Sequence, residues 1–164
     1  MQILTVDVGT GTQDVLLFDS ERELENCFSM VLPSPTVVIA DRIRAATAGR
    51  QRLVLQGVTM GGGPCHWATM DHVRAGLEAF ATPEAARTFD DDLDAVAEMG
   101  IRVVSDDEAL GLADRGATHV FLRDLALGQL MQTLVSFGVR VHLDAVAAAV
   151  FDHGAAPPGV SDRI

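Results

Sequence analysis

The sequence contains no lysine and no tyrosine, and it has only two cysteines and one tryptophan. Without lysine, the chain cannot form a Walker-type phosphate loop, a Schiff base or a lysine general base. The two cysteines, Cys27 and Cys65, are far apart, so they predict neither a disulfide framework nor a zinc site. We expect both to be reduced thiols.

Basic residues are scarce: the chain has 12 arginines and 23 acidic residues, which gives a net charge of −11. This charge argues against nucleic acid and anionic membranes as partners. No apolar run is long enough to span a bilayer, and the N-terminus resembles a strand rather than a signal peptide. We therefore expect a cytoplasmic protein. With 164 residues, 48% of them hydrophobic, the chain is long enough to bury a core as a single domain, residues 1–164.

The first twenty residues contain the most informative pattern. Two apolar runs, residues 3–6 and 15–18, are separated by Gly9, Thr10, Gly11 and Thr12, which predicts a β-hairpin. We expect the glycines to adopt positive φ angles and to allow a ligand to approach the backbone closely. The amide groups of such a turn, with the threonine hydroxyls, would form an anion site.

Carboxylates flank the predicted turn, with Asp7 before it and Asp14 after it. This arrangement suits a magnesium ion that is held partly through water beside a phosphate. Donors for phosphate together with a carboxylate for the metal predict a nucleotide site, with Asp7 as the metal ligand. The alternative is a simple tight turn in which Asp7 caps local N–H groups.

Residues 7–14, DVGTGTQD, resemble the first phosphate motif of the actin, sugar-kinase and heat-shock ATPase superfamily, D-x-G-T-x-T/S. More closely, the chain resembles an uncharacterised microbial family labelled "putative pyruvate formate-lyase activating enzyme". That second resemblance rests on the hairpin, on residues 57–64 and on residues 152–163. The superfamily resemblance implies ATP or ADP with Mg²⁺ as ligands.

Two further loops are candidate parts of the site. Gly61, Gly62 and Gly63 lie between a buried strand and a helix that begins at Pro64, a place that favours anions. The alternative is a loop of small residues that allows close packing.

The second loop contains Asp152, His153 and Gly154. It resembles the acidic-glycine loop that faces the first motif across the nucleotide in the superfamily, which implies a catalytic role for Asp152. Alanines follow where that motif has hydroxyl residues. The alternative is a surface turn.

The order of elements predicts an α/β fold with one mixed sheet, an N-terminal hairpin and flanking helices. Among these elements we expect a helix over residues 35–48 with Ser34 as its N-cap, a helix from Pro64 whose core face includes Trp67 and Phe80, and a strand over residues 139–143. This architecture resembles one lobe of the actin-like ATPases, or equally the ribonuclease-H-like fold. We therefore expect a fragment of a longer, two-lobed protein.

The sequence predicts a protein that binds a nucleotide or another phosphate-bearing small molecule, with ATPase or phosphotransferase activity and Asp7 and Asp152 as catalytic residues. A non-catalytic ligand- or partner-binding module is the alternative, and a ribonuclease-H-like nuclease is less favoured because of the acidic charge. Radical activation of pyruvate formate-lyase is rejected, since its iron–sulfur cluster needs three closely spaced cysteines.

Overall fold

The computed structural model describes residues 1–151, and these residues form two compact units. The first unit consists of Met1–Pro35 and Asp124–Phe151, and the second contains Thr36–Arg123. Each unit has its own four-stranded sheet, where the sequence predicted one mixed sheet. The α/β class is confirmed.

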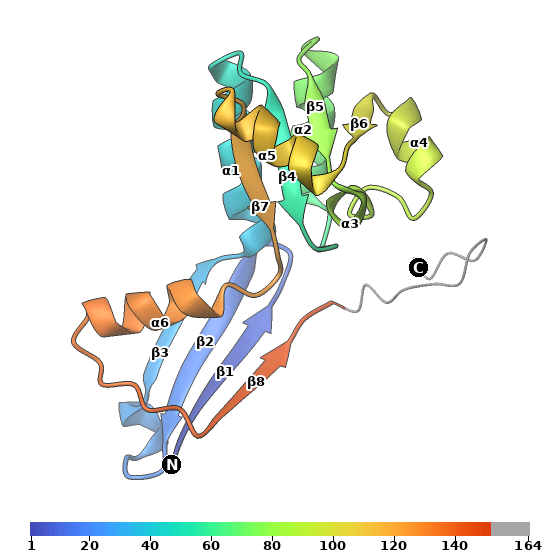
Figure 1. The fold of residues 1–164 in the computed structure, drawn as a ribbon. Helices are drawn as coiled ribbons and strands as arrows, with labels where there is room; N and C mark the ends of the chain where they lie inside the picture. The colour runs from blue at the N-terminus through green and yellow to red at the C-terminus, as the bar shows by residue number, and fades with distance from the viewer. Residues whose placement is uncertain (152–164) are drawn as a thin grey trace. The chain divides into compact units, whose positions relative to one another are not determined.

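The first unit is built on a mixed sheet with the strand order β3-β2-β1-β8. Strands β1, β2 and β3 are antiparallel neighbours, and β8 runs parallel to β1 at the edge of the sheet (Figure 1). A short 3₁₀ turn, η1 (Leu24–Asn26), connects β2 to β3. The strands are β1 (Gln2–Val8), β2 (Thr12–Asp19), β3 (Phe28–Pro33) and β8 (Ala145–Ala149).

One face of this sheet is covered by the amphipathic helix α6 (Leu127–Ser136). Alternate residues of β1 and β2 point to this face, because successive side chains of a strand lie on opposite sides. The buried cluster consists of Leu4, Val6, Val8, Val15 and Leu17 from the strands, with Leu130 and Leu134 from the helix. The other face carries exposed and half-buried side chains.

The connection from α6 to β8 is irregular, so the strand predicted over residues 139–143 is wrong. Backbone groups of this segment bind the side chain of Gln2 rather than a neighbouring strand. Gln2 Oε1 accepts from the N–H of His142 at 2.7 Å, and Gln2 Nε2 donates to the carbonyl of Arg140 at 3.4 Å. The N–H of Gln2 donates to Asp144 Oδ2 at 2.7 Å, immediately before β8 begins. Gln2 therefore fixes the path of the chain into the edge strand.

The second unit is built on a parallel sheet with the order β6-β5-β4-β7 (Figure 1). Crossover helices connect these strands, as parallel pairing requires. The strands are β4 (Leu53–Gly57), β5 (Ala79–Ala81), β6 (Ile101–Val103) and β7 (Thr118–Leu122). The helices are α1 (Pro35–Ala48), α2 (Pro64–Arg74), α3 (Pro83–Ala86), α4 (Leu93–Glu98) and α5 (Asp106–Asp114).

Both faces of the parallel sheet are buried, as expected for strands that are apolar throughout. On one face, Leu53, Leu55 and Val120 pack with residues of α1, α2, α3 and α4. On the other face, Val54 and Phe80 pack with residues of α5.

The helix that begins at Pro64 ends earlier than the hydrophobic spacing predicted. It stops at Arg74, and Gly76 follows with a φ of 74°. A left-handed residue ends a helix at low cost when it is glycine. Phe80 consequently lies in β5, and Trp67 is 63% exposed rather than part of the core.

Among residues 1–151, the structure has no helix that is both long and apolar enough to cross a membrane.

Gly57 occupies a position that only glycine fits, which gives the first prediction. Its φ is 123°, and an added Cβ would lie 2.3 Å from the carbonyl oxygen of Leu122. We expect Gly57→Ala to lower the free energy of unfolding by about 2 kcal/mol or more, measured by urea denaturation. Gly76→Ala is the matched control, since Gly76 also has a positive φ but no atom of the described residues lies within 4 Å of its added Cβ. Equal losses in the two variants would show that the contact with Leu122 is unimportant.

His72 is a fully buried histidine in the core of the second unit. Its Nε2 lies 3.2 Å from the carbonyl oxygen of Glu78, and its Nδ1 lies 2.9 Å from Thr47 Oγ1. A neutral ring can donate from Nε2 to Glu78, while the single hydroxyl proton of Thr47 lies between two acceptors, His72 Nδ1 and the carbonyl of Ile43, each 2.9 Å from Oγ1. Burial lowers the pKa of His72 below its ordinary value of 6.5, and the hydrogen bond to Glu78 opposes this shift.

This lowered pKa predicts a loss of stability in mild acid. The unfolded chain takes up a proton at His72 before the folded chain does, so the stabilisation is complete above about pH 6.5 and is lost as the pH falls toward the folded-state pKa. We expect urea denaturation between about pH 7.5 and pH 5.5 to show a steeper fall for the wild type than for His72→Gln. The control is His119→Gln, which makes the same substitution at an exposed histidine. Equal slopes in the wild type and His72→Gln would contradict the prediction.

Candidate functional site

The predicted hairpin is confirmed, and its tip consists of Thr10 and Gly11. The N–H of Gly9 donates to the carbonyl of Thr12 at 2.9 Å and closes the turn. Neither Gly9 nor Gly11 has a positive φ, so the predicted left-handed conformation is wrong. Glycine is favoured at position 9 because a larger residue would be crowded: an added Cβ would lie 3.1 Å from the carbonyl oxygen of Thr12.

The turn is attached to Ser34, the residue between β3 and α1. Ser34 Oγ donates to the carbonyl of Thr10 at 2.8 Å, and the N–H of Ser34 donates to the carbonyl of Gly11 at 3.1 Å. Ser34 has no exposed surface. The amide groups of Thr10 and Gly11 have no acceptor among residues 1–151. The two carbonyls of the tip therefore accept hydrogen bonds from Ser34, while its two amide groups donate none within the described residues.

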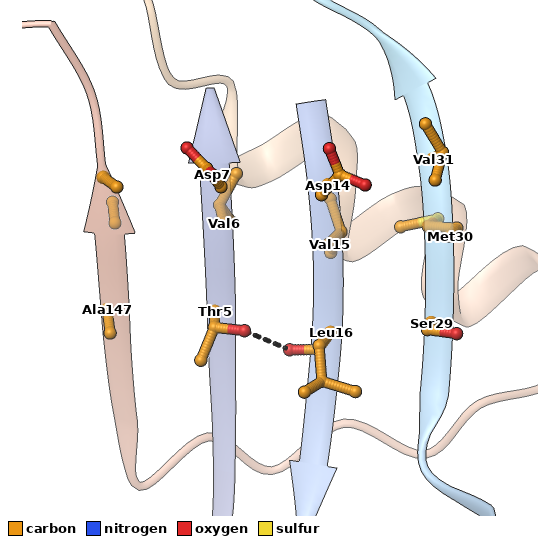
Figure 2. Close-up of a pocket in the computed structure, with 12 residues that line it drawn as sticks. Thr5, Val6, Asp7, Asp14, Val15, Leu16, Ser29, Met30, Val31 and Ala147 are labelled. Atoms are coloured by element: carbon orange, nitrogen blue, oxygen red, sulfur yellow. Dashed lines mark hydrogen bonds between the residues drawn. The ribbon is translucent and has the colours of Figure 1, made fainter. Parts of the chain in front are cut away.

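Asp7 and Asp14 are direct partners across the two strands that lead into and out of the turn. Figure 2 shows both carboxylates on the same face of the sheet, the face opposite to α6. Both residues are exposed, and neither forms an ion pair within the described residues. Residues directly opposite in a sheet have Cβ atoms about 4.5–5.5 Å apart. Two negative charges at this spacing repel each other, so a cation between them would be favoured.

A hollow of about 770 Å³ extends over this face from the two carboxylates. Such a volume is within the range of small-molecule sites. The hollow is lined by residues 5–7, 14–16, 29–31 and 147–149. Leu16 and Val31 make part of its surface apolar (Figure 2). The residues of β8 that line it are alanines, whose short side chains fill little of the hollow.

Two hydroxyl residues that the sequence reasoning missed lie on the same sheet face as the carboxylates, in the row of residues two positions further from the turn. Thr5 is two residues before Asp7 on β1, and Ser29 is on β3 (Figure 2). Thr5 Oγ1 donates to the carbonyl of Leu16 at 3.3 Å, which leaves its oxygen able to accept. The period of two along β1 was the available signal for Thr5, since it predicts the same face for Thr5 and Asp7.

No group of three or more His, Cys, Asp or Glu side chains in residues 1–151 is placed to hold a metal ion. A cation at Asp7 and Asp14 would therefore complete its shell with water, hydroxyls or ligand oxygens. This is the usual way in which proteins bind Mg²⁺, through one or two carboxylates and substrate phosphates.

Gly61, Gly62 and Gly63 lie in the second unit, before α2. Thr36 Oγ1 donates to the carbonyl of Gly62 at 2.6 Å and accepts from the N–H of Cys65 at 3.1 Å. An amide at the start of α2 is thus satisfied by a protein hydroxyl. This contact favours the close-packing interpretation of the glycine loop over an anion site.

The third predicted part of the site, Asp152, His153 and Gly154, lies outside the described residues.

Cys65 is fully buried at the start of α2, and burial raises the pKa of its thiol to about 12. A thiol with this pKa is not a nucleophile at neutral pH. Cys27 lies in the first unit and is half-buried, with its Sγ 3.4 Å from the backbone nitrogen of Asp19.

Comparisons with known proteins identify a family but no individual relative. No curated protein and no solved structure matches the chain. A family model described as "Putative pyruvate format-lyase activating enzyme (DUF1786)" matches residues 60–164, which is more than half of the chain and begins after the hairpin. The chain therefore belongs to the family described as "Putative pyruvate format-lyase activating enzyme (DUF1786)".

Proposed function

We propose that this protein binds a nucleotide with Mg²⁺ at the hairpin, in the manner of the actin-like ATPases, and acts as an ATPase or a phosphotransferase. One observation carries the proposal: Asp7 and Asp14 are cross-strand partners on the sheet face opposite to α6, and each is two residues from a turn whose Thr10 and Gly11 amides have no acceptor among residues 1–151. The metal would be held by Asp7 with support from Asp14. The phosphate oxygens would be held by the turn, Gly9 to Thr12.

The topology of the first unit supports this proposal. Three antiparallel strands are followed by a parallel strand beside β1. This order resembles the beginning of the actin-like and ribonuclease-H-like architectures. We propose that the first unit is part of such a lobe and that a second lobe belongs to the complete protein. Asp152 is proposed as a second catalytic carboxylate.

The chemistry available to such a site is positioning and electrostatic stabilisation of the transferred phosphoryl group. When bound, Mg²⁺ would offset the negative charge of the phosphates. The chain has no lysine for this task, and neither Asp7 nor Asp14 is paired with an arginine within residues 1–151. The carboxylates would position the metal, and the turn amides would orient the phosphate oxygens.

The radical chemistry of pyruvate formate-lyase activating enzymes does not fit these residues. An iron–sulfur cluster of that class needs three closely spaced cysteines, and this sequence has two, in different units. A non-catalytic binding module that uses the same hollow remains the second candidate, and the uncharged remainder of the lining favours it.

The test is a thermal melt with and without Mg²⁺ and ADP. A ligand at about one hundred times its dissociation constant adds about 2.7 kcal/mol, which raises the melting temperature of a chain of this size by roughly 5–10 °C. We expect Asp7→Asn to abolish this shift. The same variant should melt slightly higher than the wild type without ligand, because it removes the repulsion with Asp14.

Glu25→Gln is the matched control, since Glu25 is an exposed acidic residue of the same unit, in η1. It changes the net charge equally and should keep the full ligand shift. A shift that persists in Asp7→Asn, or that disappears in Glu25→Gln, would contradict the assignment of the site.

A further inference from the structure

Ser34 controls which polar groups the hairpin turn can offer to a ligand. A peptide group carries a donor and an acceptor, and in a trans peptide they point in opposite directions. The described chain has no cis peptide bonds. The carbonyl of Thr10 and the N–H of Gly11 belong to one peptide group, and the carbonyl of Gly11 and the N–H of Thr12 belong to the next.

Ser34 binds both of these carbonyls. Its hydroxyl donates to Thr10 O at 2.8 Å and its N–H donates to Gly11 O at 3.1 Å. With the two oxygens held against Ser34, the N–H groups of Gly11 and Thr12 must point away from it. A turn with this orientation presents donors rather than acceptors, which is the polarity that attracts an anion.

We infer that Ser34 is a positioning residue that sets the hairpin turn for a phosphate group, the ligand class of the proposed function on which this inference rests. Its burial isolates the two hydrogen bonds from competing water, which keeps the peptide groups in one orientation. Without the hydroxyl, the peptide group between Thr10 and Gly11 can rotate and turn its oxygen toward the anion.

Ser34→Ala removes only one of the two bonds, because the backbone N–H of residue 34 still donates to Gly11 O. We expect the affinity for inorganic phosphate and for Mg²⁺–ADP to fall about five- to tenfold. The affinity for Mg²⁺ alone should stay unchanged, since Asp7 and Asp14 are held by the β1–β2 ladder.

Gln13→Met is the matched control for a merely structural effect. Gln13 is also buried next to the turn, and its Nε2 donates to the carbonyl of Pro33 at 3.0 Å. Its Oε1 has no hydrogen-bond partner among residues 1–151, so replacement of the side chain by methionine leaves no donor of these residues without an acceptor. This variant loses a hydrogen bond to the residue before Ser34 but leaves the turn carbonyls bound.

The experiment is a calorimetric and NMR titration of the full 164-residue chain with phosphate, Mg²⁺ and Mg²⁺–ADP. The inference predicts weaker anion binding in Ser34→Ala alone, wild-type binding in Gln13→Met, and recovery in Ser34→Thr, which keeps the hydroxyl. Phosphate should shift the amide signals of Gly11 and Thr12 in the wild type and less in Ser34→Ala.

Wild-type anion affinity in Ser34→Ala, or an equal loss in Gln13→Met, would overturn the role of Ser34 while the proposed nucleotide site stands. Failure of the wild-type chain to respond to any of the three probes would overturn the proposed function, and the inference with it.

Discussion

The candidate site depends on one-sided burial of the first sheet. Burial of Leu4, Val6 and Leu17 against α6 fixes the register of the hairpin, because a slip by one residue would move every apolar side chain of a strand to the wrong face. The same register places Asp7 opposite Asp14 on the other face. The hydrophobic effect thus aligns two carboxylates that repel each other.

Local features of this fold were predictable from the sequence. The hairpin and the helix that follows Ser34 and ends at residue 48 are indicated by the hydrophobic period and by the proline and glycine residues at their ends. These features depend on neighbours within a few residues, which a single sequence displays directly.

Features that depend on distant partners were not predictable. Residues 139–143 have the composition of a strand, but Gln2 binds their backbone groups from the other end of the chain. The chain forms two sheets because the strand paired with β1 is β8, near the end of the described chain, and not one of the strands of the second unit. Of the candidate site, the sequence indicated Asp7, Asp14 and the turn. The hydrogen bonds of Ser34 to the turn could not be predicted, because they form only when β3 pairs with β2 and brings Ser34 next to Thr10.

The most direct test of a cation site between Asp7 and Asp14 is paramagnetic broadening by Mn²⁺ in a ¹⁵N-resolved NMR spectrum of the chain. At the lowest Mn²⁺ concentrations, the account predicts that amide signals around Asp7 and Asp14 disappear first, while those of Gly61, Gly62 and Gly63 persist. Earlier broadening at the acidic runs of residues 90–92 or 106–108 would contradict it. The paired carboxylates would then be an incidental result of the hairpin register.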